Sequence, residues 1–102
     1  MSAALNDPRI QAGMRRQFKL LEQRRRDGAK RIGWKVGFGA PAAKEKLKIE
    51  SALVGFLLNR ALLPDGATVS LSGWSKPVAE PEIAVEIGRD VPAGASEQEA
   101  AQ

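Results

Sequence analysis

The sequence predicts a small α+β fold, in which an amphipathic helix is followed by short β-strands. Two patterns predict it. Apolar residues recur at helical spacing between Pro8 and Asp27, and several later segments alternate apolar and polar residues as half-buried strands do. The chain has 102 residues, which is enough for at most one small domain. Its hydrophobic fraction of 43% and charged fraction of 27% are typical of soluble globular proteins.

The first predicted element is a helix from Pro8 to Asp27. Asn6 or Asp7 can cap its first turn, and Pro8 is preset for that turn. Gly28 ends the helix, and the arginines at 24–26 suit the negative helix end. The apolar positions are Ile10, Met14, Phe18 and Leu21.

A strand is expected next, from Lys30 to Phe38. Its alternation places Ile32, Trp34 and Val36 on one face, and Gly33, Lys35 and Gly37 on the other. Glycines on both sides of Lys35 leave space in which a ligand can approach the ammonium group closely. The simpler interpretation is a lysine that reaches past small neighbours into water.

The middle of the chain is predicted from shorter signals. Pro41 to Leu47 is expected to form a short basic helix, and Pro64-Asp-Gly66 has the residues of a tight turn. The apolar run from Leu53 to Leu63 fits strand or helix, with a strand-like start at Val54 to Leu58. Ala67 to Leu71 alternates as a short strand.

An acidic strand is predicted from Val78 to Ile87. Ile83, Val85 and Ile87 point one way, and the other face carries Glu80, Glu82, Ala84 and Glu86. Two glutamates two residues apart share a face, with their roots roughly 6–7 Å apart, and both can bind one hard cation. The alternative is a solvated face that happens to be acidic. Pro81 lacks an N–H, so this end is expected at an edge or a bulge.

Composition excludes several kinds of site. The chain contains no cysteine and no histidine, which excludes disulfides, thiolate metal sites and catalytic schemes that need a histidine base. Structural and catalytic zinc sites are built mainly from those two residue types, so zinc is not expected. Any metal is therefore expected to have oxygen ligands.

Charge is distributed unevenly along the chain. Residues 1–48 contain 13 Lys/Arg and 4 acidic residues, whereas residues 49–102 contain 3 and 8, and the whole chain has a net charge of +4. An internal charge match explains this as well as a phosphate-binding surface does. An RNA-binding helix in the arginine-rich front is the alternative, but no aromatic residue interleaves with the arginines to stack on bases. We expect a solvated helix face, no nucleic-acid partner, no membrane association and a cytoplasmic location.

The end of the chain carries a capping box, Ser96-Glu-Gln-Glu99, that predicts the start of a helix. Only one turn follows before Gln102, and isolated helices of that length are not stable in water. We therefore expect that a longer protein has been cut here.

Four segments in order resemble the fumarylacetoacetate hydrolase superfamily. They are Gly33-Trp-Lys-Val-Gly-Phe38, Val54-Gly-Phe-Leu57, Glu80-Pro-Glu-Ile-Ala84 and Arg89-Asp-Val-Pro92. The most similar branch contains the 2-keto-4-pentenoate hydratases and 2-oxo-3-hexenedioate decarboxylases. The resemblance implies one incomplete domain, with a helical segment at 1–29 and the front part of a mixed β-sandwich or roll, the catalytic domain, at 30–102.

The resemblance also implies a site. Glu80 and Glu82 would be two of three carboxylate ligands of a magnesium ion, with manganese as the alternative metal, and Lys35 would be the active-site lysine. The third carboxylate would lie past Gln102. Leu53 stands where one branch of the family has an acidic residue.

The function implied is a lyase, a magnesium-dependent hydratase of 2-keto-4-pentenoate-type 2-oxo acids in aromatic-compound catabolism. Full-length members would be homo-oligomers with a small 2-oxo acid as substrate, and this chain alone would be an inactive N-terminal fragment. The alternatives are a 2-oxo-3-hexenedioate decarboxylase or another C–C hydrolase of the superfamily. A small basic RNA-binding or non-catalytic interaction module is the further alternative.

Overall fold

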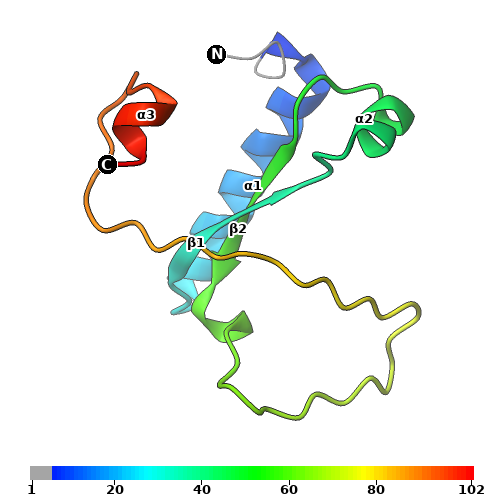
Figure 1. The fold of residues 1–102 in the computed structure, drawn as a ribbon. Helices are drawn as coiled ribbons and strands as arrows, with labels where there is room; N and C mark the ends of the chain where they lie inside the picture. Colours follow the sequence, from blue (N-terminus) through cyan, green and yellow to red (C-terminus); the bar gives the residue numbers. More distant parts are fainter. Residues whose placement is uncertain (1–5) are drawn as a thin grey trace. The chain divides into compact units, whose positions relative to one another are not determined.

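A computed structural model describes residues 6–102 of the chain (Figure 1). These residues form an α+β structure with an N-terminal helix and a two-stranded antiparallel sheet. The chain divides into two units, the first ending at Thr68 and the second running from Val69 to Gln102. The elements are α1 (Pro8–Arg26), β1 (Arg31–Gly37), α2 (Pro41–Leu47), β2 (Leu53–Leu58), the single-turn 3₁₀ helix η2 (Asn59–Ala61) and α3 (Glu97–Ala100).

Both ends of α1 are fixed by the residues that the sequence predicts. Of the two candidate caps, Asp7 is the one used, and its Oδ1 accepts a hydrogen bond from the Arg9 N–H at 2.8 Å. At the other end Asp27 is the C-cap, and Gly28 follows with a φ of 89°, a left-handed conformation that favours glycine. The predicted helix is confirmed.

The sheet is a pair of antiparallel strands connected through α2. Lys35 lies opposite Gly55, and Gly37 lies opposite Leu53. An irregularity between Arg31 and Gly33 inserts an extra residue into β1. The predicted strands at 30–38 and 54–58 and the predicted helix at 41–47 are confirmed, with strand ends shifted by one residue.

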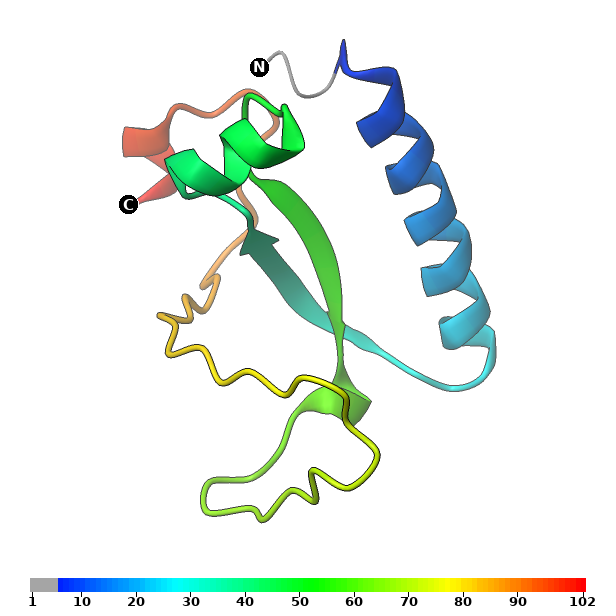
Figure 2. The same ribbon diagram turned by 90° about the vertical axis from the view of Figure 1, so that its right-hand side faces the viewer.

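A side-chain amide joins α1 to the sheet. Gln17 Nε2 donates to the Val54 carbonyl at 3.0 Å, and Gln17 Oε1 accepts from the Phe56 N–H at 2.8 Å. Backbone groups two residues apart on a strand point to the same side, so one amide reaches both. Gln17 thereby makes the hydrogen bonds that a neighbouring strand would make at the outer edge of β2. Figures 1 and 2 show α1 beside the two-stranded sheet.

The apolar core of the first unit is small. Among the described residues only Leu21 and Ala29 are buried, at 6% and 4% exposure. The Phe18 and Trp34 rings meet edge to face with centroids 6.0 Å apart, and the Arg31 guanidinium lies 4.8 Å from the Trp34 ring centroid. Directed polar contacts therefore carry much of the link between helix and sheet.

The part of the chain after Gly66 differs most from the sequence prediction. The segments Val78 to Ile87 and Ala67 to Leu71 are not strands, so both predictions were wrong. A strand exists through ladder hydrogen bonds, and in the described chain β1 and β2 are the only paired strands. The apolar row of the longer segment is consequently exposed, with Ile83 at 96%, Val85 at 78% and Ile87 at 69%.

The predicted turn and the predicted helix cap are confirmed. The turn at Pro64–Gly66 is closed by the Ala67 N–H donating to the Pro64 carbonyl at 3.1 Å, with Gly66 at a φ of 76°. The capping box of α3 is complete. The Glu99 N–H donates to Ser96 Oγ at 3.2 Å, and the Ser96 N–H donates to the Glu99 carboxylate at 2.7 Å.

Replacing Gln17 with alanine is expected to lower the free energy of unfolding by about 1–3 kcal/mol, because two hydrogen bonds are lost at the β2 edge. Gln17→Glu is expected to cost a similar amount, since a carboxylate can accept from Phe56 but cannot donate to the Val54 carbonyl. Urea unfolding followed by circular dichroism measures both. Gln23→Ala on the exposed side of α1 is the control, and equal losses from Gln17→Ala and the control would refute the role of the amide.

The cap of α1 is expected to be sensitive to acid. The Arg9 side chain, and then the Arg9 N–H, lower the pKa of Asp7 from 3.8 to about 2 by hydrogen bonding to its carboxylate. Because the pKa is lower in the folded state, the ionised cap stabilises the helix above pH 3.8, and this stabilisation is lost as the pH falls toward about 2. Asn also caps helices but does not titrate. The difference in melting temperature between the wild type and Asp7→Asn should therefore change across this window, and parallel curves would contradict the assignment.

Candidate functional site

Lys35 lies in the middle of β1 and is half-buried. Strand alternation places Gly33 and Gly37 on its face, and the register adds Gly55 directly opposite. Lys35 is therefore surrounded by three positions without side chains, two along its own strand and one across the sheet. The sequence signals the first two, whereas the third follows from the pairing register.

The backbone does not require glycine at these three positions. None of them has a positive φ, unlike Gly28 and Gly66. A Cβ at Gly37 would meet no atom within 4 Å, and one at Gly33 would come no closer than 3.9 Å to Leu57 Cδ1. A Cβ at Gly55 would lie 3.5 Å from Gln17 Oε1, an ordinary contact. The space at Gly37 is therefore open, and the space at Gly33 and Gly55 borders Leu57 and Gln17 at ordinary contact distance, so packing does not demand glycine at any of the three.

Glu80 and Glu82 are exposed in an extended segment of the second unit. Since this segment is not a strand, the shared face predicted for the two side chains is not fixed by a sheet. Residues 6–102 contain no group of three or more acidic side chains placed to hold a metal ion. The carboxylate oxygens of Glu80 and Glu82 suit magnesium chemically, but these two residues are only two of the three carboxylates expected.

The three predicted site residues fall in different units. Lys35 belongs to the first unit, and Glu80 and Glu82 belong to the second. Each unit is defined by its own contacts, so a cavity shared by the lysine and the two glutamates stays a prediction.

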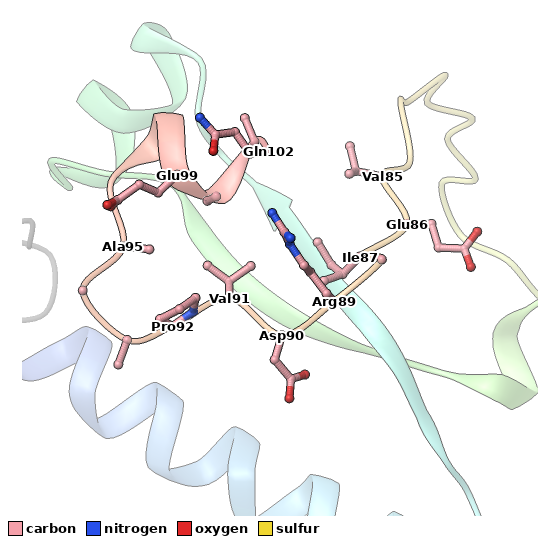
Figure 3. A pocket seen from close by; sticks show the side chains of 15 residues that line it. Val85, Glu86, Ile87, Arg89, Asp90, Val91, Pro92, Ala95, Glu99 and Gln102 are labelled. Carbon is pink, nitrogen blue, oxygen red and sulfur yellow. The ribbon is translucent and has the colours of Figure 1, made fainter.

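The second unit has a cavity of its own, with a volume of about 1020 Å³, lined by residues from Val85 to Gln102 (Figure 3). Its charged lining residues are Glu86, Arg89, Asp90 and Glu99. In Figure 3 the carboxylates of Glu86 and Asp90 point in different directions, and the Glu99 carboxylate is held by Ser96. These bonds from the Ser96 N–H and hydroxyl lower the pKa of Glu99. The carboxylates do not converge, so this cavity is not a metal site.

A second cavity of about 640 Å³ lies in the first unit, between α1 and the chain from Leu47 to Val54. Its lining is mainly apolar, and its polar members include Gln17 and Ser51. Arg9 also lines it, and its guanidinium donates to the Lys48 carbonyl at 2.9 Å and pairs with Asp7 at 2.6 Å. The lining of this cavity includes no acidic side chain, so it offers no acid–base pair for catalysis.

None of the helices in residues 6–102 combines the length and the apolar character needed to cross a membrane. Comparison with protein-family models, with curated proteins and with solved structures finds no match for this chain. The resemblance to the fumarylacetoacetate hydrolase superfamily therefore stays a hypothesis that depends on the four sequence segments.

If the glycines beside Lys35 are there to leave room for a ligand and are not needed for folding, the Gly37→Ala variant should fold normally. We expect its free energy of unfolding to be unchanged or raised by about 0.4–1 kcal/mol, because alanine reduces the entropy of the unfolded chain. Gly28→Ala is the control, since the φ of 89° at Gly28 makes alanine strained there. Chemical denaturation of both variants tests this, and a loss of stability in Gly37→Ala as large as in the control would show a structural need for glycine.

Proposed function

We propose that this chain contributes Lys35, Glu80 and Glu82 to a magnesium-dependent lyase, a hydratase of 2-keto-4-pentenoate-type 2-oxo acids. One observation carries the proposal. Lys35 lies among Gly33, Gly37 and Gly55, and neither backbone conformation nor close packing in the first unit requires glycine there. Glycines around a lysine let a flat, negatively charged substrate approach its ammonium group closely. The proposed fold is the mixed β-sandwich or roll of the fumarylacetoacetate hydrolase superfamily.

Glu80 and Glu82 would hold the metal ion, and the third carboxylate would come from outside the described residues. When bound, magnesium acts as a Lewis acid that stabilises the enolate formed beside the 2-oxo group. No histidine is required for this chemistry, in agreement with the composition of the chain.

Lys35 has two roles open to it in this scheme. Its ammonium group can pair with the substrate carboxylate and fix the orientation of the 2-oxo acid beside the glycines. In its neutral form the amine can instead take a proton from the carbon beside the 2-oxo group, because a nearby cation lowers the pKa of a lysine. Substrate enolisation permits either water addition or loss of carbon dioxide, so the decarboxylase is the closest alternative.

The proposal predicts weak metal binding that depends on two specific carboxylates. Manganese, followed by electron paramagnetic resonance, is a direct probe of the full 102-residue chain. We expect Glu80→Gln and Glu82→Gln each to weaken binding by about tenfold or more, since even changes outside the ligand set cost about 10–100-fold. Glu86→Gln is the matched control, because Glu86 alternates with the same residues in sequence but is not proposed as a ligand.

If Glu82→Gln and Glu86→Gln weaken metal binding equally, Glu80 and Glu82 attract the cation only through their negative charge, and the ligand assignment is wrong. The same sample, mixed with a 2-keto-enoate and millimolar magnesium, is expected to show no change in substrate absorbance, because only two ligands are supplied. Magnesium-dependent turnover by this chain would instead mean that it builds a complete site.

A further inference from the structure

The side of α1 that faces away from β2 is strongly basic. At about 100° per residue, Arg15, Lys19 and Arg26 fall within about 40° of one another, opposite Gln17 and Leu21, which contact the sheet or are buried. Arg16 borders the same side. We call these four exposed residues, Arg15, Arg16, Lys19 and Arg26, the basic face. It extends about 16 Å along the helix, since each residue adds about 1.5 Å.

The basic face is not neutralised within the first unit. None of its four side chains makes a hydrogen bond or an ion pair with another of the described residues. The ion pair of α1, between Arg9 and Asp7, lies at the start of the helix and outside the basic face. Glu22 is spaced to pair with Lys19 or Arg26 but bonds to neither. Within the first unit, the charges of the basic face are therefore not matched by acidic side chains.

Folding does not explain these charges. Arginines in the last turn stabilise the negative helix end, which accounts for Arg26 and its two neighbours. Arg15, Arg16 and Lys19 lie in the middle of the helix, where like charges three and four residues apart destabilise it. A negatively charged binding partner would explain why Arg15, Arg16 and Lys19 are positively charged.

The composition of the basic face indicates the kind of partner. Three of its four residues are arginine, whose guanidinium matches phosphate with two parallel hydrogen bonds. The other residues on this side are Pro8, Gln11, Ala12, Glu22 and Gln23, none of them a large apolar side chain for membrane insertion. The one aromatic ring at its border, Phe18, packs edge to face against Trp34 and so is not placed for base stacking. Contacts are then limited to phosphates, which carry no sequence information.

We infer that the basic face of α1 binds the phosphate backbone of a double-stranded nucleic acid, DNA or RNA. This differs from the expectation, drawn from the sequence, of no nucleic-acid partner, and it does not depend on the proposed lyase function. Binding through four phosphate contacts should be sequence-independent and strongly dependent on salt. The logarithm of the affinity should fall with the logarithm of salt concentration with a slope of roughly −3.6, or about 0.9 per contact. Between about 50 and 200 mM salt this amounts to a loss of roughly 150-fold.

The test is fluorescence polarisation of the full chain with labelled 20-base-pair DNA and RNA duplexes of two unrelated sequences. Arg15→Gln/Lys19→Gln removes two charges from the face and keeps residues that favour helix, and we expect it to flatten the salt slope by roughly 1.8. Lys46→Gln/Lys76→Gln changes the net charge equally at two positions outside α1 and should leave the slope unchanged. Circular dichroism checks that α1 persists in each variant.

Several outcomes would overturn the inference. They are no duplex binding at low salt, equal effects of the two double variants, and a salt-independent affinity. Binding to phosphatidylserine vesicles without binding to duplex would assign the face to a membrane surface and also defeat the proposal.

Discussion

The structure of the first unit depends on a single amide. Gln17 reaches from the middle of α1 to the outer edge of β2 and satisfies a carbonyl and an N–H there. A two-stranded ribbon is marginal alone in water, and only Leu21 and Ala29 are buried among the described residues. The paired hydrogen bonds also fix α1 along the strand, because a shift of one residue would move the amide out of reach of both groups.

This arrangement explains which elements could be predicted from the sequence. The helix α1 has its cap, apolar spacing and terminal glycine within one continuous segment, and α2 likewise begins at a proline. Local signals of that kind determine local structure. Val78 to Ile87 has an equally clear alternation, yet it is not a strand, because strand formation depends on a second segment that the local sequence does not contain. The Gln17 contact was likewise missed, since nothing at position 17 signals residues 54 and 56.

The candidate site shows the same division. The glycines at 33 and 37 are visible in the sequence, and the structure adds Gly55 through the pairing with Lys35. That none of the three glycines has a positive φ could not be inferred from residue identity. This property indicates that glycine is present there to leave room beside Lys35, since the backbone conformation does not require it. For Glu80 and Glu82 the sequence supplies the chemistry but not the geometry, because their segment has no sheet to hold it.

The exposed row of Ile83, Val85 and Ile87 has a consequence for the behaviour of the protein in solution. Extended apolar segments of this kind aggregate unless charges interrupt them, and here Glu80, Glu82 and Glu86 do so. The same glutamates therefore also protect this segment from aggregation. A cation that neutralises the first two removes this protection. Conditions that load the proposed metal site would then also favour precipitation, and a partner strand covering the apolar row would relieve that conflict.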